Sequence, residues 1–374
     1  MSALRVIISG GGTGGHIFPA ISIANEIRSK RPDAEILFVG AEGRMEMQRV
    51  PAAGYEIKGL PIAGFDRKRL WRNFGVLLKI WKSKRIARRI VSNFSPHVAV
   101  GVGGYASGPT LSVCEDLGIP TLLQEQNSYA GITNKLLAKR AKQICVAYEG
   151  MERFFPKERI LLTGNPVRQA LLSSSLHRSE AFRSLGLDEG KRTILIIGGS
   201  LGARTLNEAV LSHLATIAAT EDVQILWQTG KFYAAEIAQR LQQTTCPSNL
   251  IVTEFVSDMA AAYAVADLVV SRAGASSISE LCLLGKPSIL VPSPNVAEDH
   301  QTHNAMALVK QEAAMLVKDT EALTQLLPTA IQLVRDTSRL QEIGKQAIKL
   351  GKPNAASDIA DAVIALAEGK KLGN

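Results

Sequence analysis

The segment SRAGASSISELCLLGKPSILVPSP, residues 271–294, decides the fold that we expect for the whole chain. An apolar strand ends at Ser271, Gly274 allows a tight turn, and the small residues 275–277 leave backbone N–H groups uncovered before a helix. The start of a helix attracts anions, because its first amides lack intrahelical partners and its dipole adds partial positive charge. With Glu280 expected in the first turn, where a carboxylate can hold a ribose diol, the segment fits a nucleotide site. It equally fits an ordinary strand, turn and helix.

The same order of apolar strand, glycine turn and helix recurs along the chain. The predicted strands at 4–9, 98–102 and 192–197 run directly into GGGTGGHIFPA (10–20), GGYASGP (103–109) and GGSLGA (198–203). Open α/β sheets bind ligands at the carboxyl ends of their strands, which is where these turns lie. We therefore predict an α/β protein of two doubly wound, Rossmann-like domains that face each other across a cleft.

The domain boundary is expected at GNPVR (164–168), where Gly, Asn and Pro in sequence make a stiff turn. A length of 374 residues corresponds to about two domains. We predict a first domain at 1–164, a second at 165–352 and a final amphipathic helix within 353–374. The first glycine turn lacks the acidic residue that a dinucleotide fingerprint places after the next strand, so we do not assign it to that class.

Composition limits the partners and the chemistry. A formal charge of +9 favours an anionic partner, which includes nucleic acid, an anionic membrane and phosphates. The four cysteines are scattered, as in a reduced cytosolic protein, and we expect neither a signal peptide nor a membrane-spanning helix. His300 and His303 are three residues apart near two acids, but a zinc site usually shows two His at i and i+4 or three clear ligands. We predict no metal site.

Two polar features follow predicted strands. The first helix is expected at 17–27, and His16 lies just before it. His16 is either a base that works near neutral pH or a structural residue that caps the turn. The cluster QEQN (124–127) is either a contact for sugar hydroxyls or a turn.

Residues 64–94 combine an apolar helical stripe with a dense basic field. Leu70, Phe74, Leu77 and Trp81 fall on one helical face, and Asp66 is the only acid in the span. This pattern is typical of a helix that lies in a membrane interface. A packing helix with a solvated basic face and a nucleic-acid surface are the alternatives, and we favour the membrane.

Taken together, seven ordered motifs resemble one family of proteins. They are GGGTGGHIFPA, GGYASGP, QEQN, GNPVR, GGSLGA, the turn at 274–280 and DHQ (299–301). The chain is similar to the MurG family of bacterial peptidoglycan glycosyltransferases from residue 5 to about residue 305, and less distinctly beyond. The resemblance implies the GT-B fold and an inverting transfer of N-acetylglucosamine (GlcNAc) from UDP-GlcNAc to the 4-hydroxyl of the N-acetylmuramyl-pentapeptide of lipid I. The product is lipid II, and neither a cofactor nor a metal is required.

The resemblance also implies roles for individual residues. The first domain would take lipid I, the second UDP-GlcNAc, and the last helix would return to the first domain. His16 would be the catalytic base, Val256 would meet uracil, and Glu280 would hold the ribose. The full set of expected UDP-GlcNAc contacts is Thr13, Gly14, Gly15, Asn127, Arg168, Ser200, Val256, Ala275, Ser276, Ser277, Ile278, Ser279, Glu280 and Gln301. The acceptor contacts are Gly103, Gly104 and Tyr105, and Gly14 and Gly15 would also help to bind the acceptor's pyrophosphate. The membrane contacts are Leu70, Trp71, Arg72, Phe74, Leu77, Lys79, Trp81 and Lys82.

The resemblance implies a peripheral protein on the cytoplasmic face of the bacterial inner membrane. Its partners would be UDP-GlcNAc, undecaprenyl-linked lipid I and the anionic membrane surface. Proteins of cell-wall synthesis are further candidate partners, and nucleic acid is not expected. The alternatives within the same fold are a UDP-GlcNAc 2-epimerase and a glycosyltransferase with a soluble acceptor. A membrane-bound nucleotide sensor without catalysis is a third hypothesis.

Overall fold

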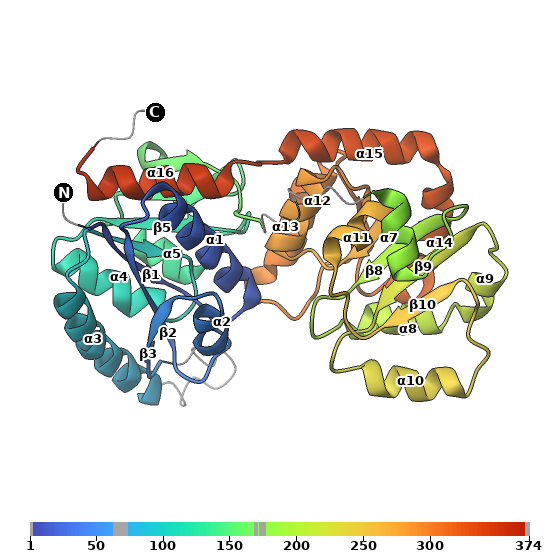
Figure 1. Ribbon diagram of the computed structural model, residues 1–374, viewed down its shortest axis with the longest axis horizontal. Helices are drawn as coiled ribbons and strands as arrows, with labels where there is room; N and C mark the ends of the chain where they lie inside the picture. Colours follow the sequence, from blue (N-terminus) through green and yellow to red (C-terminus); the bar gives the residue numbers. More distant parts are fainter. Residues whose placement is uncertain (1–2, 63–73, 168–170, 172–176, 371–374) are drawn as a thin grey trace. The chain divides into compact units, whose positions relative to one another are not determined.

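The computed structural model of the chain describes residues 3–62, 74–167, 171 and 177–370. It contains two compact units, of which unit 1 comprises Met1–Arg168 together with Lys352–Asn374, and unit 2 comprises Gln169–Gly351. Each unit is built on one parallel sheet with helices on its faces (Figure 1).

The sheet of unit 1 has the strand order β3-β2-β1-β4-β5-β6-β7, and its described strand pairs all run parallel. The elements of unit 1 are β1 (Arg5–Ser9), α1 (Gly14–Lys30), β2 (Glu35–Ala41), α2 (Glu46–Ala52), β3 (Glu56–Leu60), α3 (Phe74–Phe94), β4 (Val98–Gly101), α4 (Ser107–Asp116), β5 (Thr121–Glu125), α5 (Ile132–Leu137), β6 (Gln143–Val146), η2 (Met151–Arg153), η3 (Lys157–Arg159), β7 (Ile160–Leu162) and α16 (Ala355–Ala367).

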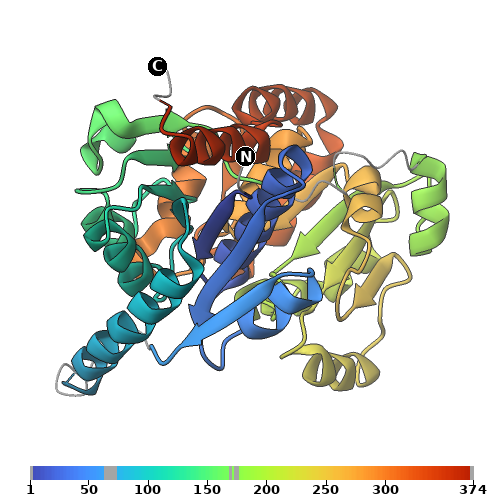
Figure 2. The ribbon, with the colours of Figure 1, turned by 60° about the vertical axis from the view of Figure 1, so that its left-hand side comes forward.

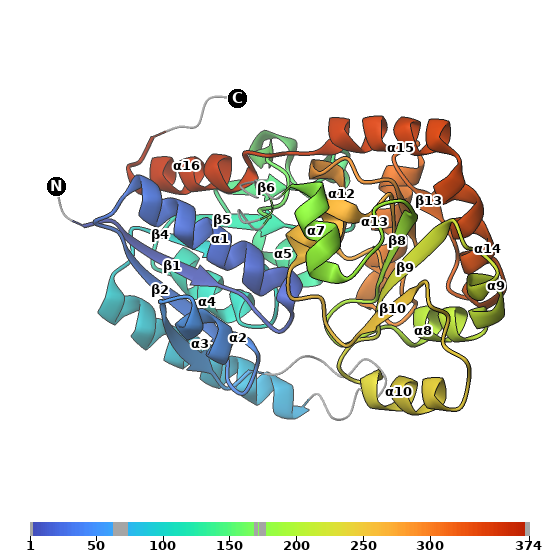
Figure 3. The same cartoon turned by 45° about the vertical axis from the view of Figure 1, so that its right-hand side comes forward.

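Strand β1 shows why helices cover both faces of this sheet. Successive strand residues point to opposite faces. Val6 and Ile8 therefore belong to one core with α1 and α16, whereas Ile7 belongs to another core with α3 and α4. Figure 3 shows α1 and α16 on one face of the sheet and α3 and α4 on the other.

The last helix of the chain, α16, packs against α1 in unit 1. Its buried Ile359 and Val363 share a core with α1, and Lys30 Nζ lies 2.6 Å from a carboxylate oxygen of Asp361. Helix α3 lies at the outside of the same unit (Figure 2). Its second half is anchored by Ala87 and Val91, which are fully buried.

Unit 2 repeats this plan with the strand order β10-β9-β8-β11-β12-β13, again with parallel pairs. Its elements are α7 (Arg178–Leu185), β8 (Arg192–Ile197), α8 (Arg204–Leu211), α9 (Leu214–Ala218), β9 (Val223–Gln228), α10 (Ala234–Gln242), β10 (Leu250–Thr253), α11 (Met259–Val265), β11 (Leu268–Ser271), α12 (Ala275–Leu283), β12 (Ser288–Leu290), η4 (Ala297–Asp299), α13 (His300–Val309), β13 (Met315–Leu316), α14 (Ala322–Arg335) and α15 (Thr337–Leu350).

In both sheets the strand order reverses direction beside the first strand. Strand β1 lies between β2 and β4, and β8 lies between β9 and β11. Such a switch point opens a crevice at the carboxyl ends of the strands, because the flanking connections leave on opposite faces. The prediction of two doubly wound α/β domains is confirmed.

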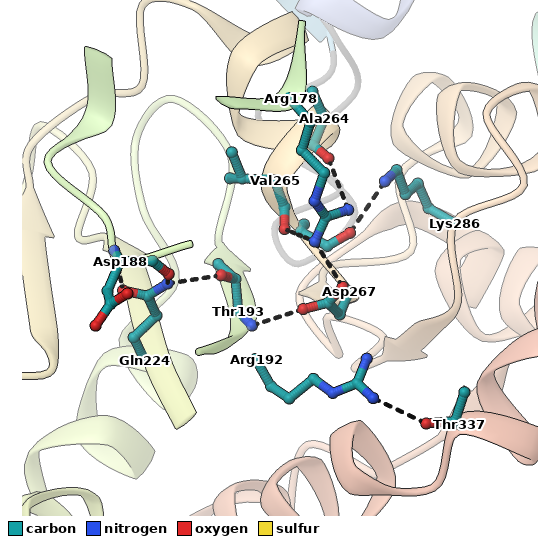
Figure 4. Close-up of polar contacts among 11 residues, drawn as sticks. Arg178, Asp188, Arg192, Thr193, Gln224, Ala264, Val265, Asp267, Lys286 and Thr337 are labelled. Atoms are coloured by element: carbon teal, nitrogen blue, oxygen red, sulfur yellow. Dashed lines mark hydrogen bonds and ion pairs between the residues drawn. The ribbon is translucent and has the colours of Figure 1, made fainter. Parts of the chain in front are cut away.

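The amino edge of the unit 2 sheet is closed by a polar network around Asp267 (Figure 4). Its carboxylate accepts hydrogen bonds from the Thr193 N–H and from Arg178 Nη2, both at 2.8 Å. Lys286 Nζ donates to the Ala266 carbonyl at 3.0 Å, and burial lowers the pKa of Lys286 to about 8. These bonds fasten the amino ends of the strands, so this edge serves structure and leaves the opposite edge for ligands.

Candidate functional site

In unit 1 two glycine turns that are remote in sequence pack together at the switch point. The Gly11 N–H donates to the Gly103 carbonyl at 3.3 Å. A β-carbon at Gly104, whose φ is +88°, would collide with the Gly11 carbonyl oxygen. Glycine is therefore required at 104 both for its backbone conformation and for this close approach. The expected acceptor residues Gly103 and Gly104 are thus brought to the turn that precedes His16, and Tyr105 beside them is 49% exposed.

His16 is the third residue of α1, and its ring is oriented by the turn before it. Nδ1 lies 3.1 Å from the Gly11 carbonyl oxygen and 3.2 Å from Thr13 Oγ1. A carbonyl only accepts hydrogen bonds, so the Gly11 contact requires the hydrogen on Nδ1 and places the basic lone pair on Nε2. Nε2 lies next to Gly103, where an added β-carbon would be 2.9 Å away. The contacts of Nδ1 therefore fit the interpretation of His16 as a residue that holds the turn.

The helix that carries His16 begins earlier than expected. Thr13 is the N-cap of α1, and Gly14 and Gly15 are its first two residues. The predicted start at residue 17 was wrong, because the glycines adopt the helical conformation and do not extend the loop. Their amides consequently lie at a helix N-terminus, which suits an anionic group.

Sequence reasoning missed Glu46, the first residue of α2, whose side chain is buried behind this turn. Its Oε2 accepts the Gly12 N–H at 2.9 Å, and its Oε1 accepts the Ala41 N–H at 3.0 Å. Glu46 is not the acidic residue of a dinucleotide fingerprint, because its carboxylate binds backbone amides of the chain itself. Glu46 comes five residues after the end of β2 and binds backbone, so the motif spacing of a dinucleotide site could not reveal it.

The QEQN cluster is mostly internal structure. Gln124 Nε2 donates to Asn165 Oδ1, and Asn165 Nδ2 donates to the Gln126 carbonyl, both at 2.9 Å. Glu125 is buried, which raises its pKa, and it accepts the N–H of Asn127 at 3.1 Å. Of the four residues, Asn127 is the half-buried one, so it remains the member of this cluster that a sugar could reach.

Unit 2 contains a cavity of about 360 Å³ at the carboxyl ends of β8 and β11, where the sheet has its switch point. Helices α8 and α12 both begin at this cavity, so two helix N-termini face one space. Among the predicted donor residues, Ser277 and Gln301 line it. Its wall consists of Ile197, Gly198, Gly199, Gly202, Ala203, Arg204, Thr205, Tyr233, Arg272, Gly274, Ser277, Ser293, Asn295 and Gln301.

Two of the cavity's supporting residues, Arg272 and Asp319, were not predicted. The Arg272 guanidinium forms an ion pair with Asp319 and donates to the Val291 carbonyl at 3.0 Å. Asp319 also accepts the Thr205 hydroxyl at 3.0 Å and so connects the start of α8 to the end of β11. Arg272 lies in the segment 271–294, directly after a predicted strand, so its place could be predicted from the sequence. Asp319 follows it by 47 positions, so no local pattern indicates it.

The structure corrects the position expected for Glu280. Helix α12 begins at Ala275, so Glu280 is its sixth residue and lies outside the first turn. The small residues 275–277 form the helix start and do not form the turn. Glu280 is 5% exposed, and its carboxylate accepts the Tyr263 hydroxyl at 3.0 Å.

The other predicted donor residues of unit 2 are not among the residues that line the cavity. Ile278 is buried, and the Ser279 hydroxyl donates to the Ala275 carbonyl at 2.9 Å. Val256 is buried, and its N–H donates to Gln228 Oε1 at 3.0 Å. Ser200 is exposed, and Ser276 is half-buried at the start of α12.

Several predicted residues lie outside the described part of the chain. These are Leu70, Trp71, Arg72 and Arg168, together with the side chains of Phe74 and Leu77. In the described part of α3, Trp81 is 64% and Leu78 71% exposed, beside the exposed Lys79 and Lys82. Among all the residues that the structure describes, no helix is long and apolar enough to cross a membrane. Among these residues, no group of three His, Cys, Asp or Glu could hold a metal ion.

Comparisons with known proteins find two family models that match the chain, one in each half. The glycosyltransferase family 28 N-terminal domain matches residues 6–146, and the family 28 C-terminal domain matches residues 193–362. The chain is 62% identical, over 98% of its length and 96% of the relative's, to a Bacteroides fragilis protein. That protein is named UDP-N-acetylglucosamine–N-acetylmuramyl-(pentapeptide) pyrophosphoryl-undecaprenol N-acetylglucosamine transferase. A Cytophaga hutchinsonii protein of the same name is 51% identical over 96% of each chain.

Two solved structures place the fold in context. Acinetobacter baumannii MurG has a TM-score of 0.75 and 30% identity, covering 96% of this chain and 99% of that one. A UDP-GlcNAc 2-epimerase from Neisseria meningitidis has a TM-score of 0.65 at 14% identity over 96% of this chain and 100% of that one. The second likeness concerns the fold alone.

Proposed function

Because the chain belongs to glycosyltransferase family 28, we propose that it transfers GlcNAc from UDP-GlcNAc to the 4-hydroxyl of the N-acetylmuramyl sugar of lipid I, giving lipid II. The near-full-length match to relatives named for this transfer carries the proposal. The chain is accordingly a UDP-GlcNAc-dependent glycosyltransferase of peptidoglycan synthesis. The epimerase alternative has only a distant likeness of fold in its favour.

Unit 2 is proposed to hold the donor. The diphosphate lies in the cavity at the starts of α8 and α12, where helix amides and the Arg272 side chain meet its negative charge. Ser277 and Gln301 contact phosphate and sugar, Ser200 reaches the diphosphate from the rim, and the Val256 carbonyl meets uracil. Asn127 in unit 1 contacts the GlcNAc hydroxyls, and Arg168, outside the described residues, reaches the nucleotide.

Unit 1 is proposed to hold the acceptor and the base. The pyrophosphate of lipid I is bound by the amides of Gly14 and Gly15 and by the turn from Gly103 to Tyr105. His16 Nε2 removes the proton of the 4-hydroxyl while that oxygen bonds to the anomeric carbon. UDP leaves with the electrons of the broken C–O bond. A single displacement inverts the anomeric centre, and a base of this kind is worth about 10²–10⁴ in rate.

The proposal is tested with radiolabelled UDP-GlcNAc and a lipid I analogue. The wild type is expected to form the disaccharide lipid, and His16→Ala to lower kcat by about 10²–10⁴ without weakening donor binding. Undiminished turnover in His16→Ala would remove the base assignment. Incubation with UDP-GlcNAc alone is the control, since conversion of the donor without acceptor would indicate an epimerase.

The ribose assignment of Glu280 needs a separate test, because its carboxylate already binds Tyr263. Glu280→Gln is expected to raise the UDP dissociation constant by about tenfold, equivalent to about 1.4 kcal/mol. Tyr263→Phe removes the hydrogen bond to Glu280 while it keeps the carboxylate, and it serves as the matched control. Equal losses in the two variants would show that Glu280 acts through the packing of α12 and does not bind the ribose.

The exposed part of α3 is proposed to dock on the anionic membrane where lipid I resides. Trp81 and Leu78 are exposed beside Lys79 and Lys82, and each basic residue near such a surface contributes about 1 kcal/mol. The double variant Lys79→Glu, Lys82→Glu should lose binding to anionic vesicles and still use a soluble acceptor. Lys58→Glu, an exposed lysine on β3, is the control. Retained vesicle binding in the double variant would contradict this docking, and with it the proposed place on the cytoplasmic membrane face.

A further inference from the structure

Glu46 is a buried carboxylate with two defined partners that the transfer chemistry described above does not use. Its side chain is 1% exposed at the start of α2. Each carboxylate oxygen accepts one backbone N–H, from Gly12 at 2.9 Å and from Ala41 at 3.0 Å. A β-carbon at Gly11 would collide with this carboxylate, so the turn has been built around it. Burying a charge is costly unless hydrogen bonds compensate for lost water, and here two amides do so.

One peptide group connects Glu46 to His16. The Gly12 N–H that binds Glu46 and the Gly11 carbonyl that binds His16 Nδ1 at 3.1 Å belong to the same planar unit. In a trans peptide these two groups point in opposite directions. Glu46 therefore holds the N–H end and the imidazole holds the C=O end. A carboxylate on the N–H side also polarises the peptide and strengthens its carbonyl as an acceptor, because linked hydrogen bonds reinforce one another.

We propose that Glu46 is a positioning residue that acts on His16 through the Gly11–Gly12 peptide. It fixes the carbonyl that retains the hydrogen on Nδ1 and so directs the lone pair of Nε2 to the acceptor hydroxyl. It also favours the imidazolium that forms when Nε2 takes that proton, just as an acid bonded directly to a histidine does. This inference rests on the proposed role of His16 as the base.

Substitution of Glu46 separates this role from donor binding and from simple structural support. In Glu46→Gln one oxygen becomes an NH₂ group, which cannot accept a backbone N–H, so the turn loses one of its two bonds. We expect kcat for the lipid acceptor to fall by about 10²-fold, as a small misplacement of a catalytic group produces, while the KM for UDP-GlcNAc is unchanged. In nitrogen-15 spectra of labelled protein, the His16 ring is expected to shift from the Nδ1–H tautomer towards a mixture. The control is Glu42→Gln, an exposed acid in the same loop.

A double-substitution cycle shows whether Glu46 acts through His16. In the His16→Ala background, Glu46→Gln should cause little further loss, because the group that it positions is gone. A full additional loss in that background, or an unchanged tautomer and kcat in folded Glu46→Gln, would overturn the proposal. If Glu46→Gln fails to fold, Glu46→Asp is used, since it keeps the charge and shortens the reach. The same shift in tautomer and kcat is expected there, and its absence counts against the proposal. The tautomer measurement needs no substrate, so failure of the wild type to make lipid II would refute the proposed function without deciding this inference.

Discussion

The glycine turns at residues 10–15 and 198–203 occupy equivalent places in their sheets, but a buried carboxylate lies against the first and an open cavity borders the second. Each follows the first strand of its unit and leads into a helix beside the switch point. In unit 1 the Glu46 carboxylate packs against the turn and accepts a hydrogen bond from the Gly12 N–H. In unit 2 the corresponding turn borders an open cavity of about 360 Å³, and the supporting acid, Asp319, binds side chains.

This difference separates two uses of one structural motif. The carboxylate behind the turn of unit 1 occupies the Gly12 N–H and fixes backbone groups that can orient a histidine. An open cavity at two helix starts attracts an anion such as a diphosphate. The same strand, turn and helix can thus present a base in one unit and a phosphate site in the other.

The comparison predicts that a methyl group introduced against each of the two turns damages a different step. The two positions are Gly104, which packs against residues 10–15, and Gly202, which lies within residues 198–203. Gly104→Ala would push the new methyl into the Gly11 carbonyl, and Gly202→Ala would push it into the Thr229 carbonyl. We expect Gly104→Ala to lower kcat by about 10²-fold with normal UDP binding. For Gly202→Ala we expect UDP affinity to weaken by about tenfold. Steady-state kinetics and titration calorimetry with UDP measure the two effects.

Both substitutions also impose strain, since each glycine has a φ of about +88° or +89° and a left-handed backbone costs other residues of order 1–3 kcal/mol. Gly54→Ala and Gly186→Ala are the controls for this cost. They have positive φ values of +80° and +66° with open space around the added methyl. If they impair kinetics as strongly as the turn variants, or if Gly104→Ala chiefly weakens UDP binding, the distinction between the turns is wrong.

A second, smaller effect is expected from the acid of unit 2. Asp319→Asn removes the charge that holds Arg272 and weakens the bond to Thr205, so the cavity wall loosens. We expect UDP to bind several-fold to about tenfold more weakly, up to about 1.4 kcal/mol, with kcat nearly unchanged. Asp222→Asn is the matched control, because its pair with Arg335 is about half exposed and such pairs contribute little.

The alternative outcome for Asp319 is equally informative. Should Asp319→Asn bind UDP normally and lower kcat, the acid of unit 2 would resemble the acid of unit 1 in its role. The proposed division between a turn that presents a base and a turn that binds an anion would then no longer hold.

The fold could be predicted from the sequence because its signals are local. Buried parallel strands read as short apolar runs, and each glycine turn directly follows its strand, as at residues 4–15 and 192–203. The candidate site was predictable where a residue lies in such a turn, as Gly103 does, or at the start of the helix that follows one, as His16 and Ser277 do. Glu46 and Asp319 were missed because they reach the turns from other elements, through contacts over 34 and 114 positions. The place of Glu280 was misjudged because small residues give no signal for where a helix begins.

The last and smallest expected effect is that of removing divalent metal ions. If the two helix starts and Arg272 supply the positive potential that the departing diphosphate needs, chelation should leave kcat and UDP affinity unchanged. The measurement is turnover with a chelator, with Mg²⁺ restored in a parallel sample as the control. Turnover that disappears with the chelator and returns with Mg²⁺ would mean that these fixed dipoles do not suffice. The cavity beside the turn of unit 2 would then have to bind a cation together with the diphosphate. Unchanged turnover would instead leave the two turns as two arrangements of backbone dipoles, one that orients a base and one that stabilises a leaving group.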